Sequence, residues 1–148
     1  MKPLAGIRVI DMTTNISGPT LTMILADLGA EVIKVERPGS GDAIRHLIPG
    51  VFEAVNKGKK SIALDLKNAE DIAFVKQLVA EVDIVIEGFR PGVMARLGLD
   101  YDQLKAINPT LIYGAISGYG PNSRTLLASP LMAAAAAVHG KIVDVNQN

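Results

Sequence analysis

Short apolar runs alternate with amphipathic stretches between residues 7 and 116. This alternation is typical of βαβ units, in which helices connect the parallel strands of one sheet. The runs are apolar enough to be covered on both faces. They predict five strands: Arg8–Met12, Glu31–Val35, Ser61–Leu66, Asp83–Glu87 and Leu111–Ile116. We therefore expect an α/β fold built on a parallel sheet with flanking helices.

Polar residues before the amphipathic stretches predict where helices begin. Ser17 and Asn68 can each cap a helix, and Asp100 can cap a shorter helix over 101–107. The two longer helices have apolar faces spaced by three or four positions. These faces are Leu21, Ile24, Leu25 and Leu28 in the first helix, and Ile72, Val75, Leu78, Val79 and Val82 in the second. Residues 38–60 are less regular, and residues 38–41 open a loop.

The end of the chain does not continue this pattern. Residues 122–129 are polar, 131–138 are alanine-rich and helix-prone, and 141–145 predict one more strand. We therefore divide the chain into one domain over residues 1–121 and a short tail over residues 122–148.

Composition narrows the class of protein. The 148 residues suffice for one domain with a real core. Lys and Arg total 15, as do Asp and Glu, so there is no broad positive field for binding nucleic acid. The absence of cysteine excludes disulfides and fits a reducing compartment. No signal peptide is visible, and no apolar run approaches the ~20 residues of a membrane span. We expect a soluble, cytoplasmic protein that does not associate with membranes.

Candidate binding residues follow the predicted strands. Ligands of open α/β sheets gather beyond the carboxyl ends of the strands. These positions hold the turn around Asn15 before a helix, the cations Arg37, Lys67, Arg90 and Arg96, and the aromatic Phe89 beside Gly88. Cations and an aromatic ring on converging loops suit a phosphorylated ligand that carries adenine. The alternative is that the cations are ordinary solvated surface charges.

Other motifs carry less information. The basic segment 56–60 is best interpreted as a solvated turn before a strand. His46 and His139 have no metal-ligand spacing, so we expect no metal site. The phosphate-binding loop of nucleotide hydrolases and the nucleophile elbow of serine hydrolases are both missing.

Several segments together resemble the class III CoA-transferases, a family that includes formyl-CoA transferase, carnitine CoA-transferase and the α-methylacyl-CoA racemases. The resemblance covers about residues 3–121. It runs through the segments 4–11, 18–19, 26–38, 56–65, 89–92, 96–99 and 108–113. Several segments in the family's order and spacing are far more specific than one motif.

The resemblance implies a Rossmann-like domain that binds coenzyme A or acyl-CoA as a substrate, with no prosthetic group. It assigns CoA contacts to Arg37, to the segment that contains Ala63, Leu64 and Lys67, to Gly88, Phe89 and Arg90, and to Arg96. The cations would meet phosphates, while backbone and Phe89 would border the adenine. The other substrate would be a small carboxylic acid, and the family's interlocked fold implies a homodimer or an association with a full-length relative.

The resemblance breaks after Asn122. In the transferases an aspartate forms a covalent intermediate with the acyl group, and in the racemases paired acid and base groups move a proton. Neither element is found here, and the tail resembles a later piece of the family, which indicates an internal loss of several tens of residues. We therefore assign no catalytic residue and expect the chain to be inactive alone.

Two branches of the family stay open. Glu87-Gly88 resembles the racemases, whereas the segment 41–45 resembles the transferases. A third hypothesis, of another class, is a non-catalytic module that binds CoA or assembles with a partner.

Overall fold

The computed structural model describes residues 2–116. Its centre is a five-stranded, fully parallel sheet in the order β3-β2-β1-β4-β5. The strands are β1 (Arg8–Met12), β2 (Glu31–Glu36), β3 (Lys60–Ala63), β4 (Ile84–Glu87) and β5 (Ile112–Ala115). The first strand of the chain thus lies in the middle of the sheet. Helical crossovers on both sides give the α/β architecture expected from the sequence.

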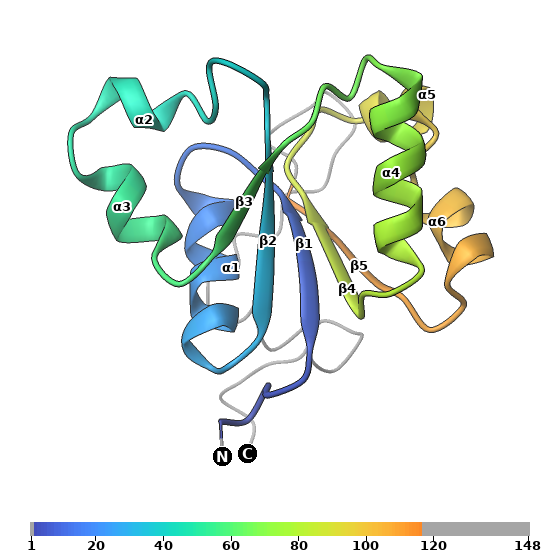
Figure 1. Ribbon diagram of the computed structural model, residues 1–148, viewed down its shortest axis with the longest axis horizontal. Coiled ribbons are helices and arrows are strands. Elements are labelled where there is room, and N and C mark those ends of the chain that lie inside the picture. The colour runs from blue at the N-terminus through green and yellow to red at the C-terminus, as the bar shows by residue number, and fades with distance from the viewer. Residues whose placement is uncertain (1, 117–148) are drawn as a thin grey trace.

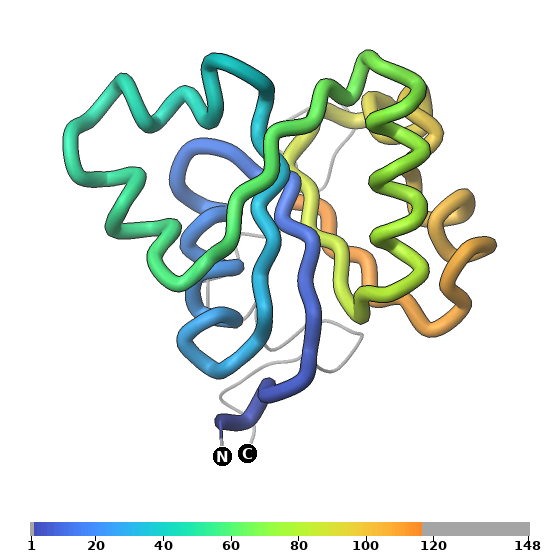
Figure 2. Tube along the Cα trace, viewed as in Figure 1, coloured from blue at the N-terminus to red at the C-terminus, as the bar shows by residue number. Residues whose placement is uncertain are grey.

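Helices cover both faces of the sheet (Figure 1). On one side lie α1 (Ser17–Asp27), α2 (Ile44–Leu47) and α3 (Val51–Asn56). On the other side lie α4 (Ala69–Val79), α5 (Val93–Leu97) and α6 (Tyr101–Ile107). The backbone trace shows that the turns after β1, β2, β3 and β4 all lie at the upper edge, where the strands end (Figure 2).

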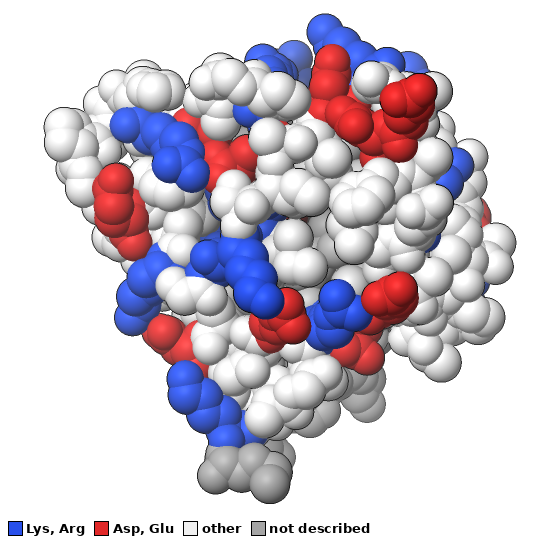
Figure 3. All heavy atoms as spheres, in the orientation of Figure 1, with Lys and Arg blue, Asp and Glu red and all other residues white. Residues whose placement is uncertain are grey.

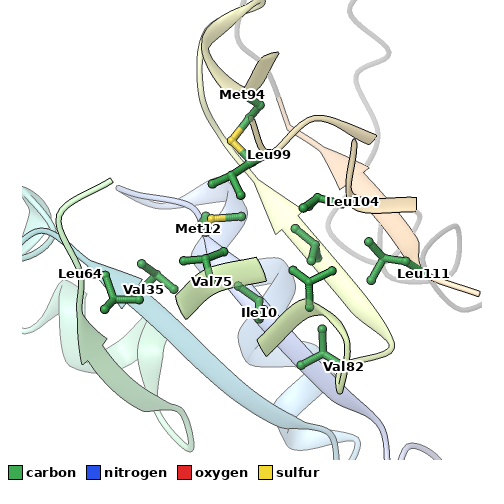
Figure 4. Packing of buried hydrophobic residues seen from close by; sticks show 12 residues of the cluster. Ile10, Met12, Val35, Leu64, Val75, Val82, Met94, Leu99, Leu104 and Leu111 are labelled. Atoms are coloured by element: carbon green, nitrogen blue, oxygen red, sulfur yellow. The ribbon is translucent and has the colours of Figure 1, made fainter. Parts of the chain in front are cut away.

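The two faces of the sheet are packed differently. The α4 and α6 face holds the larger apolar cluster, which includes Ile10, Met12 and Val75 (Figure 4). The α1 face holds a smaller cluster around Val9 and Leu25. Above that smaller cluster, toward the strand ends, the α1 face is filled by buried polar and charged side chains instead.

The predicted strands are confirmed: β1 has the predicted bounds, and the ends of the other strands shift by at most three residues. Asn68 and Asp100 are confirmed as helix caps, because their side chains accept hydrogen bonds from the Glu70 and Gln103 N–H groups. The capping role predicted for Ser17 is wrong: α1 begins at that residue, and its terminus has no side-chain cap.

Residues 38–41 form the predicted loop, and the less regular stretch that follows contains two short helices that the pattern did not predict, α2 and α3. The predicted tail elements lie outside the described residues, as does His139. The division into a domain and a tail and the internal loss therefore stay predictions.

Candidate functional site

The carboxyl ends of the neighbouring strands lie at similar heights in the sheet. In the registered ladders, Met12 lies opposite Glu87 and Glu36 lies opposite Ala63. The turns that follow these strands therefore start at similar heights. This places the segments predicted to bind a ligand side by side along one edge of the sheet.

The turn after β1 is unusually tight. Asn15 has a φ of 66°, and it is the one non-glycine residue among residues 2–116 with positive φ. A Cβ atom added to Gly18 would lie 2.3 Å from the Thr13 Cβ, so the start of α1 can approach the turn only because residue 18 is glycine.

Below this turn, Asp11 is completely buried at the centre of a polar cluster. Its Oδ2 accepts from the Thr22 hydroxyl at 2.6 Å and from Lys59 Nζ at 3.0 Å. Lys59 Nζ also donates to the Pro19 carbonyl at 2.9 Å and to Asn56 Oδ1 at 2.8 Å. Burial lowers the pKa of Lys59, and the Asp11 carboxylate opposes that shift. The cluster joins β1, α1 and the start of β3.

A second buried pair lies beside the first. Lys34 Nζ is 3.0 Å from Asp42 Oδ2, and the two side chains are only 1% and 0% exposed. Lys34 Nζ also donates to the Thr13 carbonyl at 2.8 Å. Asp42 Oδ1 accepts from the Asn15 N–H at 3.1 Å. This pair connects β2 and the segment before α2 to the turn after β1.

A third pair closes the cluster toward solvent. Arg45 Nε and Nη2 donate to the two Glu36 carboxylate oxygens at 2.8 and 2.7 Å. The Ser61 hydroxyl donates to Glu36 Oε1 at 2.7 Å. The Arg45 guanidinium lowers the pKa of Glu36 to about 2, against the opposing effect of burial. Arg45 also lies over the Phe52 ring, 3.5 Å from its centroid.

These three pairs together contain three carboxylates and three cations, so their charges balance. A buried charge is tolerated where a partner and hydrogen bonds compensate it. The cations of these pairs are engaged with the protein's own carboxylates. An anionic ligand would therefore depend on other side chains.

The cations predicted at the strand ends are free to contact a ligand. Arg37, Lys67, Arg90 and Arg96 are all exposed. Within residues 2–116, none of them forms an ion pair. Figure 3 shows basic side chains along the upper edge of the molecule, with acidic ones beside them. The local charge there is mixed, which agrees with the zero net charge of the chain.

The remaining predicted residues take different places. Ala63 ends β3 and is exposed, whereas the Leu64 side chain is buried in the larger apolar cluster. Leu64 can therefore offer only its backbone to a ligand. Phe89 is half-buried against the same cluster. A Cβ at Gly88 would lie 3.6 Å from the Thr13 Cα, so the turns after β1 and β4 are in close contact.

Glu87 lies buried beneath Phe89. Its Oε2 accepts from the Phe89 N–H at 2.7 Å. Burial raises the pKa of Glu87, while bonds from Phe89 and Tyr113 oppose that shift. Burial and then the Glu87 carboxylate raise the pKa of Tyr113. These contacts fix the turn that carries Phe89 and Arg90.

The interpretation of residues 56–60 as a solvated turn is wrong for two of its residues. Lys57 is exposed, but the Lys59 side chain is only 2% exposed and Asn56 is buried. The sequence did contain a sign that buried polar partners were needed. Two apolar strands each include a charged residue, Asp11 in β1 and Lys34 in β2, and a charged residue inside a buried strand requires buried partners.

The described residues contain neither a metal site nor a membrane span. Within residues 2–116, no group of His, Asp and Glu side chains is arranged to hold a metal ion. None of the helices described has both the length and the apolar character needed to cross a membrane.

A parallel α/β sheet with exposed cations and a tight turn at its strand ends belongs to the class of folds that bind ligands at that edge. The family model of CoA-transferase family III matches residues 4–139. The chain therefore belongs to CoA-transferase family III, as the resemblance of its motifs indicated.

Named relatives support this assignment. The chain is 46% identical over 127 residues to a succinyl-CoA:glutarate CoA-transferase from Mus musculus, which covers 81% of this chain and 29% of the relative. It is 48% identical over 124 residues to an acetyl-CoA:oxalate CoA-transferase from Acetobacter aceti, which covers 80% and 32%. The chain thus spans about a third of the length of the curated relatives it matches.

Solved structures agree on the fold. A crystal structure of the protein Rv3272 from Mycobacterium tuberculosis matches with a TM-score of 0.79 and 46% identity, over 84% of this chain and 35% of that one. A CAIB/BAIF family protein from Brucella suis matches with a TM-score of 0.78 and 42% identity, over 83% and 35%.

Proposed function

We propose that this chain binds the coenzyme A part of an acyl-CoA at the carboxyl edge of its sheet. The observation that carries this proposal is that four exposed cations without an ion pair among the described residues follow the ends of β2, β3 and β4, whereas the cations of the three pairs are already neutralised. Guanidinium groups suit phosphate oxygens, and an aromatic side chain such as Phe89 suits the adenine ring.

The reaction to which this site belongs is the transfer of CoA between carboxylic acids. The activities for which the relatives are named, such as the exchange of CoA between succinate and glutarate, support this proposal. In complete relatives the step would pass through a covalent aspartyl intermediate. We propose that this chain does not catalyse the transfer alone, since it matches about a third of each relative. Residues 41–45 favour the transferases over the racemase-like alternative. A cytoplasmic homodimer stays a prediction.

Calorimetric titration of the whole chain with CoA tests this proposal. We expect saturable binding that Arg37→Ala and Arg90→Ala each weaken by about tenfold, because each removes a charge-assisted contact. Lys57→Ala is the matched control: it also removes one exposed cation, but from an ion pair with Asp27. Equal losses in all three variants, or no heat from a folded chain, would overturn the proposal.

A further inference from the structure

The buried pair Lys34–Asp42 lies directly below the turn that follows β1. A buried ion pair is weak evidence for a purely stabilising role, because apolar replacements are often neutral or better. This pair, however, does more than neutralise itself. Lys34 Nζ donates to the Thr13 carbonyl, and Asp42 Oδ1 accepts from the Asn15 N–H. The pair therefore holds the turn at both of its ends.

The turn needs such support. Asn15 has a left-handed backbone, which persists only where the surroundings impose it. The first turn of α1 has no side-chain cap that would fix the approach of the chain. Asp42 Oδ2 has no partner within the described part of the chain other than Lys34. Each member of the pair thus depends on the other to stay in place.

Asp42 also fixes the loop after β2. Its N–H donates to Glu36 Oε2 at 2.9 Å, and its Oδ1 accepts from the Ile44 N–H at 3.1 Å. Arg37 lies between Glu36 and Asp42 in the chain, so the loop that carries Arg37 is held at both ends. The Asp42 carboxylate therefore joins the Asn15 turn to the end of the Arg37 loop, and the Glu36 carboxylate closes that loop.

We propose that Lys34 and Asp42 are positioning residues of the CoA site: they fix the Asn15 turn relative to the Arg37 loop. The inference rests on the proposed function of this edge. It predicts that CoA affinity depends on the oxygen at position 42 even where the charge and the stability of the protein are unchanged.

Two double variants of the whole chain separate positioning from stability. Lys34→Met with Asp42→Asn removes both charges but keeps an oxygen for the Asn15 N–H. Lys34→Met with Asp42→Leu removes both charges and that oxygen. Both leave no uncompensated buried charge, so we expect both to fold. The more exposed pair Lys60–Glu31, at 2.6 Å between β3 and β2, provides the control Lys60→Met with Glu31→Gln.

The readouts are the dissociation constant for CoA, urea unfolding, and hydrogen exchange of the Asn15 amide by NMR. We expect the leucine variant to bind CoA about tenfold more weakly than the asparagine variant and to lose Asn15 protection, since loss of one buried hydrogen bond changes an equilibrium constant by about that factor. Equal affinities and equal protection in the two double variants would overturn the inference. Absence of CoA binding by the wild-type chain would overturn the proposed function, whereas the Asn15 exchange rates test the anchoring of the turn regardless of that result.

Discussion

Glu36 belongs to the one of the three clustered ion pairs that lies nearest to solvent, and this residue makes the stability of the protein depend on pH. Arg45 lowers its pKa from the ordinary 4.5 to about 2 in the folded protein. Because the folded pKa lies below the unfolded one, the stabilisation is complete above pH 4.5 and is lost as the pH falls toward 2. We expect this contribution to be about 2 kcal/mol, since Arg45 is partly exposed and solvent screens the pair.

The measurement is urea unfolding of the wild-type chain and of Glu36→Gln from neutral pH downward. The variant should be less stable at neutral pH, and its stability should fall less steeply through the acid range. Glu70→Gln, at an exposed position, is the control and should keep the wild-type profile. Parallel profiles for Glu36→Gln and the wild-type chain would show that Glu36 does not carry this dependence.

Single residues were predictable to the extent that local sequence determines their place. Arg37, Lys67 and Arg90 follow parallel strands, and that rule alone places them at the ligand edge. Lys59 was not predictable, because its partner Asp11 lies 48 positions earlier and only the fold brings the two together. The same holds for Leu64, whose side chain enters the core instead of facing a ligand.

At the scale of elements, the helix caps give a direct test of where the helices begin. Asn68 and Asp100 each satisfy a free N–H of α4 and α6, whereas no side chain does so for α1. We expect Asn68→Ala and Asp100→Ala to lower the free energy of unfolding by about 1 kcal/mol each. Ser17→Ala should change it by less than about 0.5 kcal/mol.

Thermal and urea unfolding of the three variants, measured in the same buffer, test this prediction. If Ser17→Ala lowered the free energy of unfolding as much as Asn68→Ala, Ser17 would act as a cap, and the structure would be contradicted. Since Ser17 and Asn68 are both exposed, the comparison of these two variants isolates the capping bond from effects of core packing.

The elements that the sequence missed are the short ones. Helices α2 and α5 have four and five residues, too few for a helical period to show in the pattern. The strands and α4 were predictable because apolar runs and caps reinforce each other over a longer stretch. The predicted end of β3 was too late because apolar residues continue past the last hydrogen bond to β2, which the Leu64 N–H donates to the Glu36 carbonyl.

At the scale of the whole molecule, zero net charge leaves no overall field to attract an anion. Attraction must come from the few exposed cations at the strand ends. We expect CoA affinity to fall about tenfold between about 0.05 and 0.5 M NaCl, because salt screens exposed charges at these separations.

The stability that the buried ion pairs contribute should depend far less on NaCl concentration, since salt screens buried charges weakly. Titrations at several NaCl concentrations, with urea unfolding in the same buffers, separate the two responses. CoA affinity that is independent of salt would show that the exposed cations do not meet the phosphates.

The central place of β1 also has a consequence for synthesis on the ribosome. The first strand to emerge needs β2 on one side and β4 on the other, and β4 begins only at Ile84. Until that segment is made, one edge of the future central strand has unpaired N–H and C=O groups and an apolar surface, which are the features that promote aggregation. A nascent chain halted between β3 and β4 is therefore the form of this protein that most needs a chaperone.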